Sequence, residues 1–491
     1  MNFKISLAFS FLFCLSIMNA QNEPIPCGTS ETKVEWLKKY QSNQIAYSKT
    51  EDTLFVPLSI HIVGSDEGVG FFSVESLLNA FCVLNEDYAA SRIRFFIEGD
   101  LHYISNSAYA MHNFGVGYEM MQNNNIPNSI NCYIVADPAG ACGYSYYDTG
   151  IALSKNCLGI SDHTWAHEIG HNLSLPHTFY GWEGITHENS EVAPNYVDGE
   201  LVEKVDGSNC ANAADGFCDT PPDYLSRRWA CSNDGLSTAI QQDPNGETFR
   251  SDGTLFMSYS TTSENCRSRF SEEQTEAMRN NLYGPREHYL YNQTPVPHML
   301  DVDLELISPI ENIVVGDPAE GIELTWEAIP NATHYIIQVN PFPSFSSVLN
   351  TLITTNPYAV VEGLDAERKY FWRVRPYSNY SSCIPFSTKG RFETGTTTTG
   401  LDELEWSSSF EMYPNPLSVA TSLNVEYTLP ESTSLYLDIL DLTGKRVYTQ
   451  NIEGAKGKNK HQITLSPLPK GLYLLNLIGN EGQVTRKIII R

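Results

Sequence analysis

The sequence predicts an α/β (α+β) domain with a mixed sheet and one histidine-bearing helix, followed by two all-β sandwich modules. Before residue 295, apolar β-branched runs alternate with segments of helical spacing, which is typical of a sheet backed by helices. From about residue 306, short alternating strands separated by turn residues replace that pattern. At 491 residues the chain is also too long for one hydrophobic core. We therefore expect separate units at 51–295, 303–396 and 411–491, with a linker at 397–410.

The predicted first unit is a sheet flanked by helices. Apolar spacing from Leu77 to Tyr88 predicts a helix over 74–90. The histidine-bearing helix should begin near Ser161 or Asp162, since both are good N-caps. Residues 140–155 should include an edge strand on which an extended peptide could lie, using main-chain hydrogen bonds. Strands are expected at 53–63, 93–97 and 130–136, and a closing helix at 270–282.

The N-terminus carries an export signal. Residues 1–20 contain an apolar run from Ile5 to Met18, with Ala20 before a polar stretch, as in a cleavable signal peptide. No other apolar run reaches membrane-spanning length, so no transmembrane segment is expected. The polar residues 21–50 are interpreted as a pro-segment.

The charge and cysteine content of the chain indicate which kinds of partner and environment to expect. Lys plus Arg total 31 against 58 Asp plus Glu, a net charge of -27, which argues against nucleic acid as a partner. Ten of the eleven cysteines follow the signal, as expected of an exported protein with disulfides. Their connectivity does not follow from spacing.

The central motif is the stretch from His163 to His177. His167 and His171 stand four apart, which on a helix places both imidazoles on one face to grip one metal ion. Glu168 projects toward the same opening, where a carboxylate can take a proton from water. His177 follows a Leu-Pro pair that should end the helix and return the chain beneath the metal. Three imidazoles with a fourth position open are typical of catalytic zinc.

Four stretches form a pattern: the run 167–179, the run 215–221, Phe256-Met-Ser-Tyr259, and Cys266 before Phe270. In this order they resemble the pappalysin family of metzincin metallopeptidases. The resemblance covers roughly residues 51–295 and implies a metzincin-like fold for that unit. Two residues depart from the pattern: Ser174 stands where glycine is usual, and Ser258 replaces an aspartate.

This resemblance implies roles for several residues. Met257 would form a turn beneath the zinc, and Tyr259 would donate a hydrogen bond to the tetrahedral oxyanion. Asp215 and Thr220 would bind calcium, with a plain turn cluster as the alternative. Glu264, two residues before the cysteine that follows the turn, would select a basic residue after the cleaved bond; a solvent-exposed glutamate is the alternative. A disulfide between Cys231 and Cys266 is also implied.

Cys27, in Pro26-Cys-Gly28, has two interpretations. Its thiolate could cap the zinc until the pro-segment is removed, because thiolate is a good zinc ligand. A disulfide is the alternative, and composition favours it slightly.

The remaining units resemble two known modules. Alternating strands at 322–326, 335–339 and 370–374, with Leu364 six residues before Tyr370, resemble a fibronectin type III module that serves as a spacer. Motifs at 412–416, 441–445, 468–473 and 487–490 resemble the C-terminal sorting domain of type IX secretion cargo. This implies export through outer-membrane secretion machinery, to the medium or the cell surface.

The sequence thus predicts a secreted zinc-dependent endopeptidase that hydrolyses peptide bonds in proteins, with Glu168 as general base. The alternative is a surface adhesin or binding protein with a non-catalytic protease-like domain.

Overall fold

The computed structural model describes most of the chain. The predicted signal at 1–20, most of the predicted linker and Glu264 lie outside the described residues. The described ranges are 25–30, 32–42, 52–187, 190–261, 266–290, 303–346, 348–396, 409–417, 422–441, 444–465, 468–479 and 482–491.

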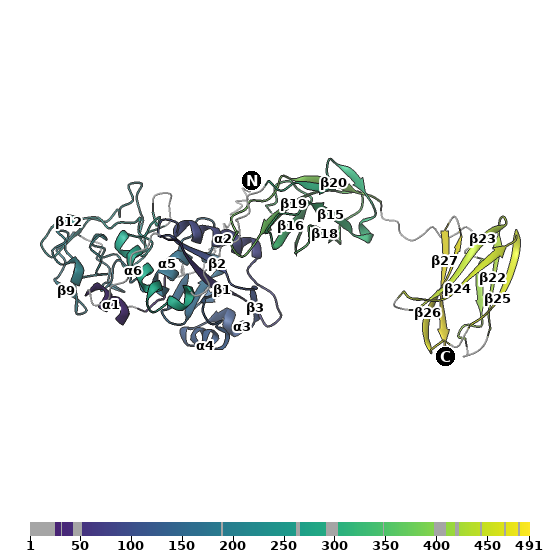
Figure 1. The fold of residues 1–491 in the computed structure, drawn as a ribbon, viewed down its shortest axis with the longest axis horizontal. Helices are drawn as coiled ribbons and strands as arrows, with labels where there is room; N and C mark the ends of the chain where they lie inside the picture. Colours follow the sequence, from purple (N-terminus) through teal and green to yellow (C-terminus); the bar gives the residue numbers. More distant parts are fainter. Residues whose placement is uncertain are drawn as a thin grey trace, which may run out of the picture.

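The first unit is built on a six-stranded sheet (Figure 1). Its strand order is β2-β1-β5-β8-β7, and β3 pairs with a further stretch of β1. All pairs are parallel except that of β7 with β8, so β7 is an antiparallel edge strand within the range predicted for one. The bounds are β1 Leu54–Gly64, β2 Ile93–Ile97, β3 His102–Ser105, β5 Ile130–Val135, β7 Gly143–Tyr146 and β8 Gly150–Ser154.

Helices cover both faces of this sheet, which explains why β5 and β8 are buried along their whole length. Helix α2 (Val74–Asp87) and helix α5 (Thr164–Asn172) share one core with Ile134 of β5 and Leu153 of β8. Helix α4 (Phe114–Asn124) packs on the other face against Tyr133. The other helices are α1 Glu35–Gln41, α3 Ser107–Ala110 and α6 Glu272–Tyr283, with 3₁₀ turns at Lys155–Cys157, Cys210–Asn212 and Glu287–Leu290.

Two helix ends differ from the predicted ones for local reasons. The closing helix α6 begins at Glu272 rather than at residue 270, because the Ser271 side chain and Gln274 form a capping box. Helix α5 has His163 at its N-cap, while the Asp162 carboxylate still accepts the N–H of Thr164 at 2.7 Å. Short two-residue strands complete the unit: β4 Met111–His112, β6 Asp137–Pro138, β9 Tyr196–Val197, β10 Glu200–Leu201, β11 Gln241–Gln242 and β12 Thr248–Phe249.

The second unit is a two-sheet β sandwich with its own core around Trp326 and Trp372. The sheets have the orders β13-β15-β18 and β14-β20-β19-β16-β17. The Tyr370 hydroxyl accepts the N–H of Asp365 at 2.9 Å, next to Leu364. The bounds are β13 Leu306–Ser308, β14 Ile313–Val315, β15 Ile322–Trp326, β16 His334–Asn340, β17 Asn350–Thr354, β18 Tyr358–Val361, β19 Lys369–Tyr377 and β20 Gly390–Thr394.

This sandwich is joined covalently to the first unit. A disulfide links Cys82 on α2 to Cys383 in the sandwich. Beside it, the Arg375 guanidinium donates to the Asn79 side chain at 2.6 Å. The sandwich is therefore held against the helix α2, which shares its core with α5.

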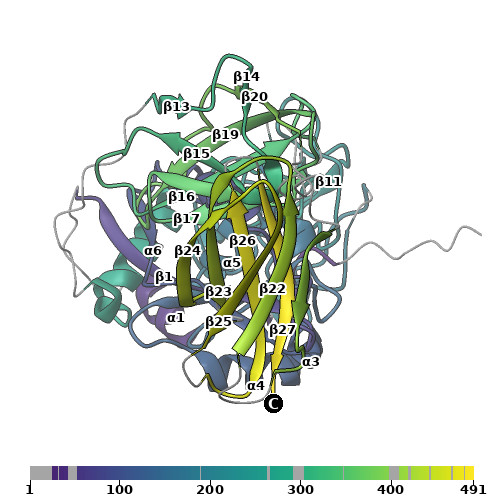
Figure 2. The same cartoon turned by 90° about the vertical axis from the view of Figure 1, so that its right-hand side faces the viewer.

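The third unit is a second β sandwich (Figure 2). Its sheets have the orders β21-β22-β25 and β24-β23-β26-β27, and alternate residues such as Leu435, Leu437 and Ile439 fill the core between them. The bounds are β21 Glu411–Tyr413, β22 Ser422–Leu429, β23 Thr433–Leu440, β24 Arg446–Gly454, β25 Gly457–Thr464, β26 Gly471–Gly479 and β27 Gly482–Ile490. Among the described residues, no helix has the length and apolar character needed to cross a membrane.

Candidate metal centre

Helix α5 places three of the predicted site residues. His167 and His171 lie one turn apart on the same face, and Glu168 follows the first of them. All three side chains are buried. The helix thus presents two imidazoles and one carboxylate to the same side.

The chain then reverses and returns His177 to the two helical histidines. Ser174 has φ 88, so it adopts the left-handed conformation that favours glycine. This conformation costs a residue with a side chain about 1 kcal/mol. The N–H of Leu175 donates back to the Gly170 carbonyl at 2.9 Å, which closes the helix end.

The three imidazoles converge through one nitrogen each. The Nε2 atom of His171 lies 3.1 Å from Nε2 of His167 and 3.1 Å from Nε2 of His177. Tetrahedral zinc with Zn–N bonds near 2.0–2.1 Å needs nitrogens about 3.3 Å apart, so this donor set fits the ion. The Cys27 Sγ belongs to the same group, whose ligand atoms all lie within 4.8 Å of one another.

The outer nitrogen of each ring faces an acceptor. Nδ1 of His167 lies 2.7 Å from the Phe256 carbonyl, and Nδ1 of His171 lies 2.8 Å from the Leu175 carbonyl. Nδ1 of His177 lies 3.7 Å from a carboxylate oxygen of Glu183. The two carbonyl acceptors keep the proton on Nδ1 of His167 and His171 and leave Nε2 free to bind metal.

Burial keeps the imidazoles neutral, as metal ligands must be. Burial and the neighbouring histidines hold the pKa of His167 and of His171 well below the usual range. Burial alone lowers the pKa of His177 to about 3. Burial also raises the pKa of Glu168 to about 8, while hydrogen bonds from Cys27 and Thr29 act in the opposite direction.

Met257 lies directly beneath helix α5. It is fully buried, and a Cβ atom added at Gly170 would stand 2.5 Å from its Sδ atom. The Met257 carbonyl accepts the N–H of Thr178 at 3.2 Å, next to His177. The Tyr259 ring contacts the His177 ring edge-on at a centroid distance of 4.9 Å.

Residues 25–30 and 32–42 are here called the N-terminal segment, and its first residues, 25–29, lie along the edge that carries strand β7. The N–H of Cys142 donates to the Ile25 carbonyl at 2.8 Å, and the N–H of Gly28 donates to the Gly143 carbonyl at 2.9 Å. The bridge between Ile25 and Ala141 is parallel. The edge that was predicted to hold an extended peptide is therefore covered by the chain itself.

Three groups of the candidate site contact this segment. The Cys27 thiol lies among the three histidines, and the Cys27 carbonyl accepts the Tyr259 hydroxyl at 3.2 Å. The Thr29 hydroxyl donates to Glu168 at 3.0 Å and accepts the N–H of Ser145 at 2.8 Å. The preference for Cys27 in a disulfide is wrong: among the described cysteines, it is buried and unpaired, because it lies among the histidines instead.

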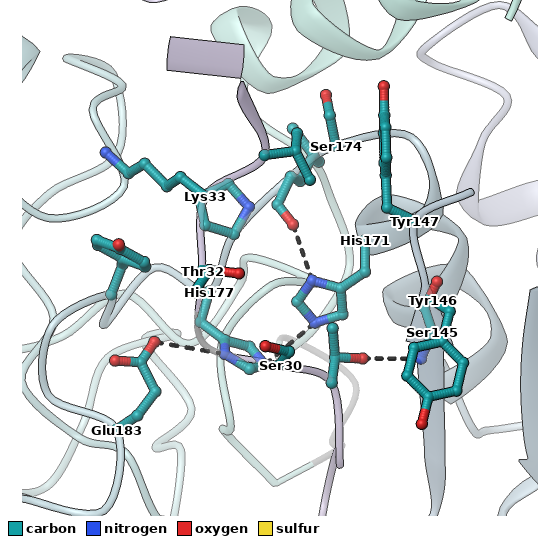
Figure 3. A pocket seen from close by; sticks show the side chains of 15 residues that line it. Ser30, Thr32, Lys33, Ser145, Tyr146, Tyr147, His171, Ser174, His177 and Glu183 are labelled. Atoms are coloured by element: carbon teal, nitrogen blue, oxygen red, sulfur yellow. Dashed lines mark hydrogen bonds and ion pairs between the residues drawn. The ribbon is translucent and has the colours of Figure 1, made fainter. Parts of the chain in front are cut away.

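A cavity of about 200 Å³ opens beside His171 and His177 (Figure 3). The N-terminal segment forms one wall through Lys33, and the loop after α5 forms another. In Figure 3, the Glu183 carboxylate points toward the His177 ring.

Lys33, which lines this cavity, interacts electrostatically with the acidic side chains of Asp215 and Glu203. The Thr220 hydroxyl donates to the Asp215 carboxylate at 2.9 Å, so these two predicted calcium ligands are in contact. Glu203 is 3% exposed, and one of its carboxylate oxygens has no hydrogen-bond partner among the described residues. Burial raises the pKa of Asp215 to about 7 and that of Glu203 to about 9, while the Lys33 ammonium acts in the opposite direction on both.

The structure also places the remaining predicted residues. Disulfides join Cys231 to Cys266 and Cys210 to Cys218, and a further one joins Cys142 to Cys157. His163 contacts the Asp87 carboxylate at 2.9 Å.

Sequence reasoning missed Thr29 and Glu183. Thr29 stands two residues after Cys27, which is a weak signal once Cys27 is assigned to the metal. Glu183 lies in an irregular loop with no periodicity, so no signal in the sequence marked it.

Comparisons with known proteins agree with two parts of this description. A family model described as a secretion system C-terminal sorting domain matches residues 411–491. An extracellular metalloprotease of Neurospora crassa is 26% identical over 188 residues, which cover 32% of this chain and 66% of that protein. One of Sordaria macrospora is 26% identical over 200 residues, which cover 35% and 69%. The chain thus spans about two thirds of the length of these relatives.

The similarity to solved structures is low. The chicken CNTN1 FN1-FN3 domains are 15% identical, with a TM-score of 0.18, and the match covers 37% of this chain and 68% of that chain. A TM-score this low does not show a shared fold. The sorting domain, together with the extracellular relatives, shows that the protein is secreted or displayed at the cell surface.

Proposed function

We propose that this protein is a zinc-dependent endopeptidase of the metzincin type, similar to the pappalysins. The observation that carries the proposal is the convergence of three Nε2 atoms, with 3.1 Å from His171 to each of the other two, beside the buried carboxylate of Glu168. The distant relatives named extracellular metalloproteases support the same activity. Its substrates would be proteins or peptides.

In this mechanism, His167, His171 and His177 would hold the ion. The bound ion would supply Lewis-acid chemistry toward water and the scissile carbonyl. Glu168 takes the proton from the attacking water and passes it to the leaving amine. The Tyr259 hydroxyl donates a hydrogen bond to the carbonyl oxygen as negative charge develops there.

Glu168→Ala tests this proposal against the adhesin alternative. The variant should bind zinc with the wild-type stoichiometry and lose cleavage of a denatured protein, since general-base catalysis is worth roughly 10²–10⁴-fold. With residues 21–50, the predicted pro-segment, removed, the wild-type protein should lose cleavage in a chelator and regain it with zinc. A protein that binds no zinc, or a variant that retains proteolysis, would contradict the proposal.

The N-terminal segment acts as a pro-segment that keeps the enzyme latent. Cys27 would supply the fourth zinc ligand, because thiolate binds zinc well. The Thr29 hydroxyl would hold the Glu168 carboxylate in a hydrogen bond, and the Cys27 carbonyl would accept the hydrogen bond of the Tyr259 hydroxyl. All three catalytic groups are then engaged until the segment is removed.

Four finer assignments belong to the same proposal. Asp215 and Thr220 would hold calcium, supported by their contact and by the buried carboxylate of Glu203. Glu264 would favour a basic residue after the cleaved bond, which cleavage-site mapping on a peptide library would test. The middle sandwich would be a fibronectin type III-like spacer, and the last unit would engage outer-membrane secretion machinery.

A further inference from the structure

The three histidines differ in what holds their outer nitrogens. His167 and His171 face backbone carbonyls, which no substitution removes. His177 faces the Glu183 side chain, with 3.7 Å between Nδ1 and Oε1. Since His177 lies in a loop rather than on α5, its orientation depends on such contacts more than theirs does.

Glu183 is itself held in place. Its Oε2 atom accepts the N–H of Gly181 at 2.7 Å. Its Oε1 atom is buried and has no hydrogen-bond partner among the described residues, so it remains available to the imidazole. The Phe179 ring stacks on the His177 ring at a centroid distance of 4.6 Å and fixes the plane of the imidazole.

We propose that Glu183 is a positioning residue, which fixes the tautomer and orientation of His177 for metal binding. A carboxylate has two acceptor oxygens, and here two donors face it: the N–H of Gly181 and Nδ1–H of His177. A carboxylate behind a metal-binding histidine also raises the basicity of the ligand. This inference rests on the proposed zinc site and names a residue that acts on it through His177.

The test is the zinc affinity of the full chain, measured by competition with a chromophoric chelator. The variants are Glu183→Gln, Glu183→Ala and the control Glu200→Gln, an exposed carboxylate that contacts the Tyr180 hydroxyl at 3.4 Å. The amide of Glu183→Gln has one acceptor oxygen for two donors, so one of them loses its partner. We expect zinc affinity about 10–100-fold lower in both Glu183 variants and unchanged in the control.

Cobalt provides a second readout. The visible absorption bands of the Co²⁺-loaded chain should change in the Glu183 variants because the ligand geometry changes. Thermal unfolding of the metal-free chains shows whether each variant is folded. If Glu183→Ala is unfolded, Glu183→Gln decides the result, because its amide oxygen can still accept the N–H of Gly181. If a folded Glu183 variant has the same zinc affinity and the same cobalt spectrum as the wild type, the role of Glu183 is overturned, while the proposed function stands. Failure of the wild-type chain to bind zinc would overturn the proposed function as well.

Discussion

The Thr29 hydroxyl donates a hydrogen bond to the Glu168 carboxylate at 3.0 Å, across 139 residues of sequence. The same hydroxyl accepts the N–H of Ser145 on β7. Thr29 therefore ties the candidate general base to the edge strand on which a substrate would lie.

Thr29→Val should weaken latency. Valine has a similar shape but can neither donate to Glu168 nor accept from Ser145. A hydrogen bond to a charged group contributes about 1.5–3 kcal/mol, so release of the segment should become roughly 10- to 100-fold more favourable. The measurement is residual proteolysis by the unprocessed chain, with Thr32→Val, at an exposed position, as the control. Equal activity in both variants would count against a role for Thr29.

Cys27→Ala should produce activity before the segment is removed. The substitution removes the thiol from the group formed with the three histidines. Cleavage of a protein substrate by the unprocessed chain is the measurement, and Cys132→Ala, which removes a buried thiol elsewhere, is the control. A Cys27→Ala chain as latent as the wild type would show that the thiol does not block the site.

Tyr259→Phe should lower kcat of the processed enzyme with little change in KM. The ring keeps its contacts with His177 and Phe179, while the hydroxyl that would stabilise the developing charge is lost. Loss of one such donor costs roughly 10²–10³-fold in kcat. Steady-state kinetics check this, with Tyr180→Phe, in the cavity beside His171 and His177, as the control. A change confined to KM would indicate a role in substrate binding.

Stability without divalent cations should fall as the pH rises. Burial raises the pKa of Asp215 to about 7 and that of Glu203 to about 9, above their values in the unfolded chain. Their contribution is therefore fully present below about pH 4 and is lost as the pH rises through the folded-state values. Thermal unfolding between about pH 5 and pH 9 measures the effect, and Asp215→Asn should flatten it. Calcium should restore stability at high pH if this loop binds it.

Gly170→Ala should destabilise the first unit. The added Cβ atom would stand 2.5 Å from Sδ of Met257, so the sulfur must move within a closely packed core. Overpacking of this kind costs about 1–3 kcal/mol. The melting temperature of the metal-free chain measures it, and Gly159→Ala, where an added Cβ has open space, is the control.

The sequence predicted those features that depend on residues close to one another along the chain. The four-residue spacing of His167 and His171 fixes their common face on a helix, because helical geometry is local. The strands at 54–64 and 130–135 follow from continuous apolar runs, which mark a sheet covered on both faces. The preference for a disulfide at Cys27 failed because composition cannot reveal which partner a thiol meets.

By itself, therefore, the sequence determined the helix with its two histidines and the central strands at 54–64, 93–97 and 130–135. Only the tertiary structure decided that Thr29 meets Glu168, that Glu183 lies behind His177, and that Cys383 is bonded to Cys82. The physical reason is that spacing along a helix or strand is set by local backbone geometry, whereas contacts between distant segments depend on how the sheet, its helices and the loops pack together.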